Sequence, residues 1–530
     1  MPFPHTDVLV LGSGLAGLCA AVYCRRQGLD VLVCSKSKPG LGSCSAISQG
    51  HFRASIGDFG PEEHKNLTLQ AGKGLNQLDK LQALTENAAR DVQELQEFGV
   101  TLAGRAKGYD CQAKQLGLEG RCITRPMTRQ AESLGVRFQA PFFAWRIAVQ
   151  DNRAVGVWGF EPGKEEPVLL TCRSLILATG GAGSIYAQTD NPQGMIGDGY
   201  ALSLEAGLSL MDMEFVQFYP LCTGQSRTSL LLPPLLGEVG TLENAQAEDI
   251  VSKYGIQTRP LAIAARDELC QAMALEAEAG LVFPDGSLRL RLQQKDSIWR
   301  EARKTFGVQS TQALRSWAEK LAAKQQGSIS IKPAAHFCMG GIAGQADAGT
   351  PIQGLFAAGE VTGGLHGANR LGGNALAETA VFGKLAAQGA AQAACDLQDP
   401  HWSKLEPAPQ FSTPPVEDPG QSISQLRQKL QMLIWLHAGI LRSKESLESG
   451  LKELDVLKTE FERHAPAPRS RIKALELANM LQVAKAILTA ALAREESRGS
   501  HYRSDFPHTD QALDKHIYPR LQEGRLQLDW

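Results

Sequence analysis

Residues 358–376 combine many glycines with a few groups that can do chemistry. The stretch A-G-E-V-T-G-G-L-H-G-A-N-R-L-G-G-N-A-L holds six glycines, and its ionisable side chains are Glu360, His366 and Arg370. Glycine lets the backbone approach a flat or charged ligand closely, because it has no Cβ and tolerates positive φ. A single Arg in such a run can bind an anion through two parallel N–H groups. The stretch therefore predicts a ligand-binding loop, with a Gly-rich surface loop as the alternative.

A second Gly-rich pattern, G-x-G-x-x-G, lies at residues 12–17. It follows a predicted buried strand at 7–12 and opens a helical run that ends at Gly28, and residues 30–34 predict a second strand. In such a strand–helix–strand unit the glycines allow a tight turn, close approach to a pyrophosphate and close packing of helix on strand. We therefore predict a dinucleotide site. The usual ribose-binding acid is absent, and Ser35-Lys36 stands there with a hydroxyl that can still bind a ribose.

Further elements must position these loops. Helical periodicity covers 62–98 and closes at Gly99, and short strands alternate over 137–172 around the turn Asp151-Asn152. Residues 174–183 then predict a buried strand that runs into a Gly-rich turn. In flavoproteins of the glutathione-reductase type, such a strand returns the chain to the dinucleotide-binding sheet.

Shifts in composition divide the 530 residues into three predicted parts. Residues 222–335 lack the Gly-rich character of their flanks, which indicates an inserted domain. Residues 396–420 are rich in Pro and predict a linker, and 421–498 predict two or three helices broken at 466–468. We predict a discontinuous cofactor-binding domain over 1–221 and 336–400, an inserted domain over 222–335 and a C-terminal helical domain over 401–530.

The composition limits the partners and cofactors. With 54 basic and 56 acidic residues the net charge is −2, which provides no broad basic surface for nucleic acid. The 11 cysteines include no C-x-x-C pair, so we expect no metal site, neither an iron–sulfur cluster nor structural zinc, and scattered cysteines fit a reducing cytoplasm. The N-terminus has no signal-peptide pattern, and no run reaches the roughly 18 apolar residues of a membrane-spanning helix. We expect a cytoplasmic protein for which any membrane association would need a partner.

The assembled motifs resemble one family, the flavoproteins of succinate dehydrogenase, fumarate reductase and L-aspartate oxidase. The matches span most of the chain and include D-V-L-V-L-G-S-G-L-A-G (7–17), I-L-A-T-G-G-A-G (176–183), Q-F-Y-P (217–220), H-F-C-M-G-G-I (336–342), H-G-A-N-R-L-G-G-N-A-L (366–376) and S-R-G-S-H-Y-R-S-D-F-P (497–507). The resemblance implies an α/β fold. A Rossmann-like, glutathione-reductase-type FAD-binding domain would carry an inserted α+β capping domain and a C-terminal helical domain.

The resemblance also implies FAD, bound in an extended pose beneath a capping domain that excludes water. The pyrophosphate would lie on the first glycine loop, the adenosine ribose near residues 35–36 and the ribityl chain at Glu360. The isoalloxazine would rest on residues 43–50, Asp198 and the backbone of 375–376. The residues expected to bind FAD are Gly12, Ser13, Gly14, Leu15, Ala16, Gly17, Ser35, Lys36, Ser43, Cys44, Gln49, Gly50, Thr179, Gly180, Asp198, Glu360, Arg370, Ala375 and Leu376.

The chemistry implied by the resemblance is hydride transfer between flavin N5 and one carbon of a polarised C–C or C–N bond. An Arg of the capping domain handles the proton on the neighbouring carbon, and Arg266 matches that position. His336 and Arg370 match the positions that bind a substrate carboxylate, where fixed donors would also draw electron density from the reacting carbons. The alternatives are an exposed helix charge at Arg266 and a packed core residue at His336.

The sequence departs from the family where the second carboxylate of a dicarboxylate would bind. Tyr219 replaces a His, Leu232 and Pro233 replace a Thr-Glu pair, and Leu236 replaces an Arg. A free carboxylate against Leu and Pro would be desolvated without partners, which is costly. We therefore expect a substrate with one polar and one apolar end, and not fumarate, succinate or aspartate. Tyr219, which we include among the catalytic residues, either hydrogen-bonds a substrate oxygen or packs.

A second departure concerns how FAD is attached. Membrane-bound relatives hold FAD covalently through a His, and Cys44 occupies that position here. We therefore expect non-covalent FAD, with a cysteinyl link as the alternative, and no link through His51.

We predict an FAD-dependent oxidoreductase that reduces or forms a C=C bond next to a carboxylate, carbonyl or thioester. One alternative is L-aspartate oxidase. Another is the flavin subunit of an electron-transfer assembly whose partner carries iron–sulfur clusters. A flavin-binding scaffold without catalysis is the third, and the retained Arg266, His336 and Arg370 argue against it.

Overall fold

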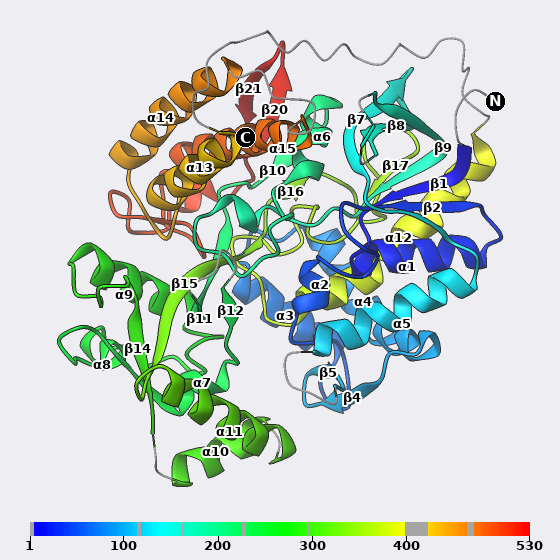
Figure 1. Cartoon of the computed structure of the whole chain (residues 1–530). Helices are drawn as coiled ribbons and strands as arrows, with labels where there is room; N and C mark the ends of the chain where they lie inside the picture. The colour runs from blue at the N-terminus through cyan, green and yellow to red at the C-terminus, as the bar shows by residue number, and fades with distance from the viewer. Residues whose placement is uncertain are drawn as a thin grey trace.

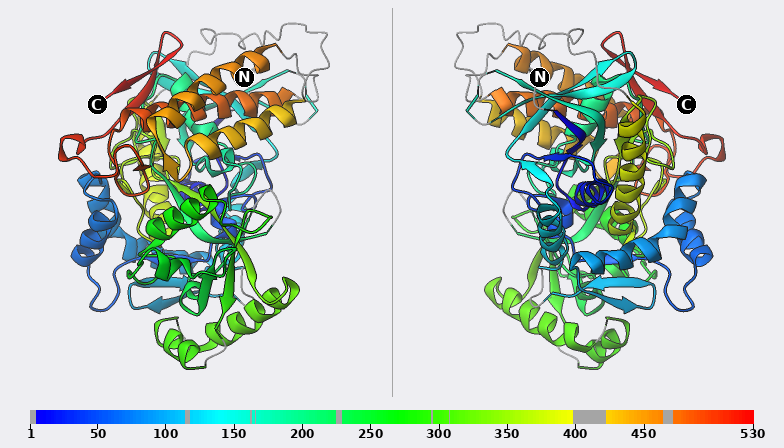
Figure 2. Two further views of the ribbon diagram at one scale, coloured as in Figure 1. Left: turned by 90° about the vertical axis from the view of Figure 1, so that its left-hand side faces the viewer. Right: turned by 90° about the vertical axis from the view of Figure 1, so that its right-hand side faces the viewer.

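The computed structural model describes residues 5–113, 118–161, 163–164, 166–224, 229–293, 296–306, 308–397, 422–463 and 471–530, apart from the side chains of 302–306 and 308–310. Figure 1 shows three regions: a central sheet with its helices, a green region at the lower left, and orange helices at the upper left. In the side views of Figure 2 the green region and the orange helices lie at opposite ends of the molecule.

The central sheet contains the predicted strand–helix–strand unit. β1 (His5–Leu11), α1 (Leu15–Arg26) and β2 (Val31–Cys34) follow one another, and β1 lies parallel to both β2 and β9 (Val168–Leu177). The strand order is β6-β2-β1-β9-β8-β7, with β17 also paired to β9. The remaining strands are β6 (Arg137–Gln139), β7 (Phe143–Gln150), β8 (Arg153–Phe160) and β17 (Leu355–Ala357). The predicted Rossmann-like α/β fold is confirmed.

Two glycines explain the close packing between β1 and α1. Gly12 has φ of +109°, and a Cβ there would lie 2.1 Å from the carbonyl oxygen of Ala178. A Cβ on Gly17 would lie 2.0 Å from the carbonyl oxygen of Gly12. Both clashes are with backbone, so a larger residue would push α1 off the sheet. The N-terminus of α1 is thus held at the carboxyl edge of the parallel strands, where open α/β sheets bind ligands.

The helix predicted over 62–98 is interrupted. α3 (Pro61–Ala71) and α4 (Leu78–Glu94) are separated by residues 72–77, in which Lys73 and Gly74 have positive φ, and η1 (Leu95–Phe98) ends at Gly99 as predicted. The break has a tertiary cause: Gly72 accepts a hydrogen bond from the backbone of Ala368, and the backbone N–H of Gln77 donates to Gly364. Residues 72–77 therefore support the Gly-rich stretch through backbone hydrogen bonds.

The hairpin predicted at Asp151-Asn152 joins β7 to β8. The two residues have φ of 50° and 58°, the left-handed geometry of a two-residue hairpin turn. Other elements around the central sheet are α2 (Cys44–Ile47), β3 (His51–Arg53), β4 (Leu102–Arg105), β5 (Gly108–Cys111), α5 (Glu119–Ser133), η2 (Gly183–Ile185), α6 (Asp198–Glu205), β10 (Leu210–Met211), β16 (Gly341–Ile342) and α12 (Asn374–Asp396). The helix α1 packs against both α5 and α12.

The green region of Figure 1 is built on a five-stranded sheet with the order β12-β11-β15-β14-β13. Its elements are β11 (Val216–Thr223), β12 (Leu230–Leu231), α7 (Leu235–Glu238), β13 (Gly240–Glu243), α8 (Ile250–Lys253), α9 (Arg266–Glu278), β14 (Leu288–Leu292), α10 (Asp296–Phe306), α11 (Val308–Lys324) and β15 (Ile329–Cys338). We call it the capping region. β11 and β15 run across the boundaries predicted at 222 and 335, and the division into domains stays a prediction.

Three helices follow where helical periodicity predicted two or three: α13 (Ile423–His437), α14 (Lys444–Glu462) and α15 (Arg471–Ala493). The chain ends with β18 (Leu441–Arg442) paired to β19 (Tyr502–Arg503), η5 (Gln511–Leu513) and the hairpin of β20 (Tyr518–Gln522) and β21 (Arg525–Asp529). Most of the predicted linker at 396–420, and the break at 466–468, lie outside the described residues.

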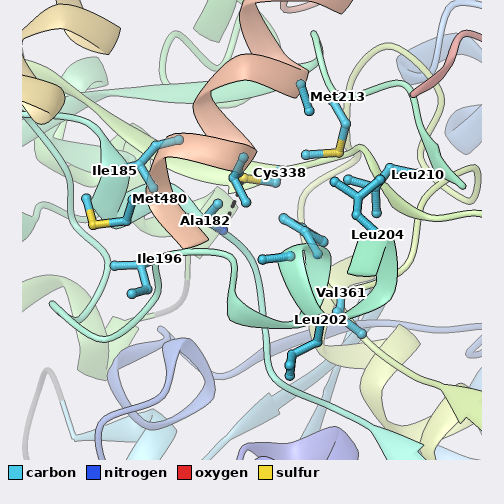
Figure 3. Close-up of a cluster of buried hydrophobic side chains, with 14 of the residues drawn as sticks. Ala182, Ile185, Ile196, Leu202, Leu204, Leu210, Met213, Cys338, Val361 and Met480 are labelled. Carbon is cyan, nitrogen blue, oxygen red and sulfur yellow. Dashed lines mark hydrogen bonds between the residues drawn. The ribbon is translucent and has the colours of Figure 1, made fainter. Parts of the chain in front are cut away.

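The helix α15 is, among the described residues, the one helix long and apolar enough to cross a membrane. It contacts α6, α13 and α14, and 61% of its most apolar window is buried inside the structure. That burial is typical of a core helix. Figure 3 shows Met480 of α15 close to Ile185 and Ile196, in a core that also includes Cys338 at the end of β15. The C-terminal helices thereby pack on the loops that carry the site.

Candidate active site

One cavity of about 1620 Å³ brings the predicted site together. It is lined by loops at the carboxyl edge of the central sheet, by the Gly-rich stretch and by the capping region. Every residue predicted above to bind FAD or to act in catalysis lines it, except Gly17. Gly17 instead lets α1 pack against the β1–α1 loop.

The glycine loop before α1 forms an open cradle. A Cβ placed on Gly14 would meet nothing closer than Ser43, at 3.5 Å, so no protein atom requires glycine there. The first turn of α1 contains no acidic residue, which leaves the positive end of the helix dipole to a ligand. The backbone N–H of Leu15 donates to Ser45 Oγ at 3.1 Å. A bare glycine beside a helix N-terminus with no acidic side chain fits the close approach of a pyrophosphate.

Lys36 and Asp198 are in direct contact. Lys36 Nζ lies 2.5 Å from Asp198 Oδ2 and 3.0 Å from Glu476 Oε1. Burial alone would lower the pKa of Lys36, but the two carboxylates raise it above its usual range. The resemblance assigned Asp198 to the isoalloxazine and Lys36 to the ribose. Because the two side chains touch, the regions expected to contact the ribose and the isoalloxazine meet at this ion pair, and both assignments stay predictions.

Glu360 is a buried carboxyl at the cavity wall. Its Oε1 accepts a hydrogen bond of 3.1 Å from the backbone N–H of Cys338. Burial raises its pKa to about 7, against the opposing effects of that hydrogen bond and of Arg370. At neutral pH the side chain can therefore both donate to and accept from a hydroxyl group, as the predicted contact with a ribityl chain requires.

Two arginines meet at the junction of the Gly-rich stretch and the capping region. Arg370 Nη2 donates to Gln217 Oε1 at 2.8 Å, and its guanidinium lies 4.7 Å from the ring centre of Phe337. Arg266 Nη2 donates to Asn369 Oδ1 and to the backbone carbonyl of Arg370, each at 3.0 Å. Both guanidinium groups are buried, and the Nε–H of each makes no hydrogen bond to a described residue. Buried donors without partners beside a cavity are suited to binding an anionic ligand.

Burial also changes how strongly these arginines hold their protons. The pKa of Arg266 is lowered by burial, against the attraction of Asp267. The pKa of Arg370 is lowered to about 9, first by burial and then by the charge of Arg266. Arg370 is thus still cationic at neutral pH, while a second positive charge beside it favours the arrival of an anion.

His336 is held by a carboxylate behind it. Its Nδ1 lies 2.7 Å from Asp190 Oδ2, and Asn191 donates to Asp190 Oδ1 at 2.8 Å. This contact fixes the ring and leaves Nε2 without a partner among the described residues. The ring is 5.6 Å from that of Tyr219, centre to centre. His336 therefore lines the cavity with one free ring nitrogen, and the alternative of a packed core histidine is not favoured.

Tyr219 already uses its hydroxyl within the protein. The hydroxyl donates to the backbone carbonyl of Leu232 at 2.8 Å, and burial raises its pKa well above the usual value, so it stays a phenol. Its one hydrogen is used, and only an acceptor lone pair remains for a substrate. The geometry favours packing over the predicted hydrogen bond to a substrate oxygen.

The cavity has an apolar wall, but its residues differ from those expected. Pro233 lines the cavity as predicted, whereas Leu232 and Leu236 are fully buried in the core of the capping region. Their chain neighbours, Leu231 and Leu235, line the cavity instead. The helix α11 adds Leu314 and Trp317, for which the sequence carried no signal beyond amphipathic periodicity. Gln217, Asn369 and Asp190 were also missed, although the first two lie inside quoted motifs.

Cys44 and His51 both line the cavity. Cys44 Sγ donates to Asn191 Oδ1 at 3.3 Å, and burial followed by the charge of Glu360 raises its thiol pKa well above the usual value. His51 Nδ1 lies 2.8 Å from Asp110 Oδ1. A protonated thiol is a poor nucleophile. This fits the expectation of non-covalent FAD, which stays a prediction.

Two family models match most of the chain. The FAD binding domain family matches residues 7–376, and the fumarate reductase flavoprotein C-terminal family matches residues 427–527. A fumarate reductase (CoM/CoB) subunit of Methanothermobacter marburgensis is 32% identical, over 95% of this chain and 95% of that protein. L-aspartate oxidase of Mycobacterium leprae is 31% identical, over 95% and 93%. A solved quinol-fumarate reductase chain with menaquinol has a TM-score of 0.85 at 25% identity, over 100% of this chain and 98% of its own.

Proposed function

This chain belongs to the flavoprotein family of fumarate reductase, succinate dehydrogenase and L-aspartate oxidase, and on that premise we propose that it reduces or forms a C=C bond conjugated to a carboxylate, carbonyl or thioester in a partly apolar substrate. The protein is an FAD-dependent oxidoreductase, because the family uses FAD and the cavity of this protein fits that cofactor. Bound FAD supplies the atom that gives or accepts a hydride. The steps below concern what the side chains of this protein do.

Arg370 and His336 are proposed to bind the polar end of the substrate, and we call this pair the grip. Both line the cavity, and each keeps an unpaired nitrogen among the described residues after its protein contacts are made. A buried guanidinium and a ring fixed by Asp190 would hold a carboxylate or carbonyl without reorganising. Electron density would then be drawn toward the grip and away from the carbon that receives the hydride.

Arg266 is the proposed proton-handling group for the neighbouring carbon. Asn369 and the backbone of Arg370 fix its Nη2, and its Nε–H donates to no described residue. A guanidinium is normally too weak an acid for this task, but burial lowers the pKa of Arg266 and so eases loss of a proton. Asp267 Oδ1, 3.8 Å from Arg266 Nε, is the nearest described carboxylate to restore the charge.

The observation that supports this class of substrate is the set of side chains that the capping region contributes to the cavity wall. Residues 229–235 and the helix α11 give the cavity only uncharged side chains among the described residues: Ser229, Leu230, Leu231, Pro233, Pro234, Leu235, Thr311, Ala313, Leu314 and Trp317. A second carboxylate placed there would lose its hydration without gaining a cation. A substrate with one polar end and an apolar remainder is therefore favoured over a dicarboxylate.

Reoxidation of the reduced flavin tests this proposal. The purified protein is photoreduced, and fumarate, iminosuccinate analogues, and enoates or enoyl thioesters with apolar tails are added in separate reactions. We expect rapid reoxidation only by the compounds with apolar tails. Rapid reoxidation by fumarate would overturn the substrate class, and rapid reoxidation by iminosuccinate analogues would favour an L-aspartate oxidase.

A second candidate is the flavoprotein subunit of an electron-transfer complex. It is favoured by the name of one relative, which is a subunit of a fumarate reductase. The chain has no C-x-x-C pair, so a partner protein with iron–sulfur clusters or a diffusible donor would deliver the electrons. We place the protein in the cytoplasm, where 11 free cysteines would stay reduced, with any membrane contact made through that partner. Co-purification with an iron–sulfur protein would support this candidate.

A further inference from the structure

We propose that an apolar chamber formed by Leu231, Leu235, Ile263, Leu314 and Trp317 binds the alkyl tail of a 2-enoic acid, and that Leu314 and Trp317 set the length of the tail. We call these five residues the tail chamber. The inference rests on the proposed function and adds to it the substrate class and the residues that select within that class.

The tail chamber is assembled from four separate parts of the capping region. Leu231 comes from β12, Leu235 from α7, Ile263 from the loop before α9, and Leu314 and Trp317 from α11. All five line the same cavity as His336 and Arg370. Leu235 and Leu314 are 2% and 5% exposed, and Trp317 is half-buried. The chamber is thus continuous with the proposed grip.

One stripe of α11 faces the cavity. Thr311, Leu314 and Trp317 recur every three residues, which places them on one side of a helix, and all three line the cavity. Ala318 and Ala322, one step around the helix, are buried in the core of the capping region and do not line the cavity. Leu314 and Trp317 belong to the same hydrophobic cluster as these alanines and also line the cavity, so the apolar face of the helix is shared between the core and the cavity. Trp317 is half-buried, and an occupant of the cavity can cover more of its ring.

Ile263 joins the tail chamber to the reacting site. It lies three positions before Arg266, and its Cγ2 would be 3.9 Å from a Cβ placed on Gly372 of the Gly-rich stretch. The capping region and the floor of the site therefore approach each other at this residue. We place the next carbons of a substrate held at Arg370 beside Ile263, and the remaining carbons in the part of the same cavity that α11 lines.

The chemistry of the cavity restricts the occupant. The grip holds one carboxylate, the double bond must be conjugated to it, and no described charged side chain reaches the cavity from β12, α7 or α11. A linear alkyl tail satisfies all three conditions. Each methylene moved from water into an apolar site contributes enough to raise kcat/KM about fourfold. Reactivity should therefore climb with tail length until the tail chamber is full and then fall.

The test measures reoxidation of the photoreduced holoenzyme by but-2-enoate, hex-2-enoate, oct-2-enoate and dec-2-enoate, with kcat/KM for each. We expect kcat/KM to rise about fourfold per methylene over the first part of the series. Leu314→Trp fills the tail chamber and should move the optimum to shorter acids, whereas Trp317→Ala enlarges it and should move the optimum to longer acids. Leu321→Ala is the control, since Leu321 lies on α11 against the core and does not line the cavity.

A binding measurement separates this inference from the reaction proposed above. Butanoate, hexanoate, octanoate and decanoate are titrated into the oxidised holoenzyme, and the change in flavin absorbance is followed. If no enoate reoxidises the flavin but the affinity for saturated acids rises with length and shifts in Leu314→Trp, the proposed reaction fails and the tail chamber stands. The tail chamber is overturned if neither kcat/KM nor the affinity for saturated acids depends on tail length. It is also overturned if Leu321→Ala shifts these dependences as much as Leu314→Trp does.

Discussion

Arg266 Nη2 donates a hydrogen bond of 3.0 Å to the backbone carbonyl of Arg370, so the capping region and the Gly-rich stretch meet through two buried arginines. Asn369 Oδ1 strengthens this contact by accepting from Arg266 Nη2 and from the backbone N–H of Arg370, each at 3.0 Å. Two cations held together in this way repel each other, and the charge of Arg266 adds to burial, the larger cause, in lowering the pKa of Arg370. We propose that a bound carboxylate would relieve this repulsion and so couple substrate binding to the placement of Arg266.

Replacing Arg266 should remove turnover and leave the flavin in place. We expect Arg266→Ala to lower kcat by about 10²–10⁴-fold, the usual contribution of a positioned proton donor or acceptor. The flavin content, read from the absorbance of the purified protein, should equal that of the wild type. The control is Arg259→Ala, since the Arg259 side chain is 47% exposed and pairs only loosely with Glu238, at 3.6 Å. Surviving turnover in Arg266→Ala would show that another group handles the proton.

Asn369 should act as a positioning residue. Its Oδ1 accepts from Gln217 Nε2 at 2.6 Å, from the guanidinium of Arg266 and from the backbone N–H of Arg370. Asn369→Ala therefore frees the Arg266 guanidinium and loosens Gln217, whose Oε1 accepts from Arg370 Nη2. A misplacement of about 1 Å can cost about 10²-fold in rate, and we expect a loss of that order in kcat/KM with weaker binding of saturated acids.

The matched control for that prediction is Asn374→Ala. Asn374 is also buried in the Gly-rich region, but it binds His64 and Thr68 and does not line the cavity. Both variants should lose stability, measured by urea unfolding, because each leaves buried polar groups unpaired. Only Asn369→Ala should lose activity. Equal losses in the two variants would assign Asn369 a purely structural role.

The glycine loops could be predicted from the sequence because their chemistry is local. Gly12 needs positive φ and Gly17 admits the backbone of its own turn, and both of these requirements are local, although Gly12 also leaves room for the distant backbone of Ala178. The Gly-rich stretch and the strand–helix–strand unit were found for the same reason. The break at residues 72–77 was not, because its cause is a distant contact with Ala368 and Gly364.

The side chains that form the apolar wall of the cavity could not be identified from the sequence alone. Leu231 and Leu232 are adjacent leucines, yet the first lines the cavity and the second is in the core. Successive side chains point to opposite faces in extended backbone, so the pairing of β12 with β11 decides which leucine faces the cavity. The same limit applies to Trp317, since an amphipathic helix does not reveal whether its apolar stripe faces a core or a cavity.

Glu360 should make the stability of the apoprotein fall as pH rises. The folded protein keeps the Glu360 proton up to a pKa of about 7, whereas the usual value is 4.5, so between these values the folded state binds more protons than the unfolded state. Stability is then greatest at the acidic end and declines toward neutral pH, by an amount of order 3 kcal/mol.

This prediction is checked by urea unfolding of the apoprotein at pH values between 4.5 and about 7. Glu360→Gln should flatten the pH dependence, because the amide cannot ionise. Glu205→Gln, at an exposed position on α6, should keep the slope of the wild type. A slope that survives in Glu360→Gln would assign the effect to another group.

Tyr219→Phe decides between packing and substrate binding at the cavity wall. The hydroxyl donates to Leu232 O at 2.8 Å, so its removal should cost about 1–2 kcal/mol of stability and leave kcat/KM nearly unchanged. If the hydroxyl instead bound a substrate carboxylate, kcat/KM would fall by about 10–100-fold, the value of a hydrogen bond to a charged group. Tyr186→Phe is the matched control, since its buried hydroxyl donates to Ala438 O at 3.2 Å and does not line the cavity. If the two variants lose similar stability and keep similar activity, the Tyr219 side chain packs in the cavity wall and its hydroxyl does not bind the substrate.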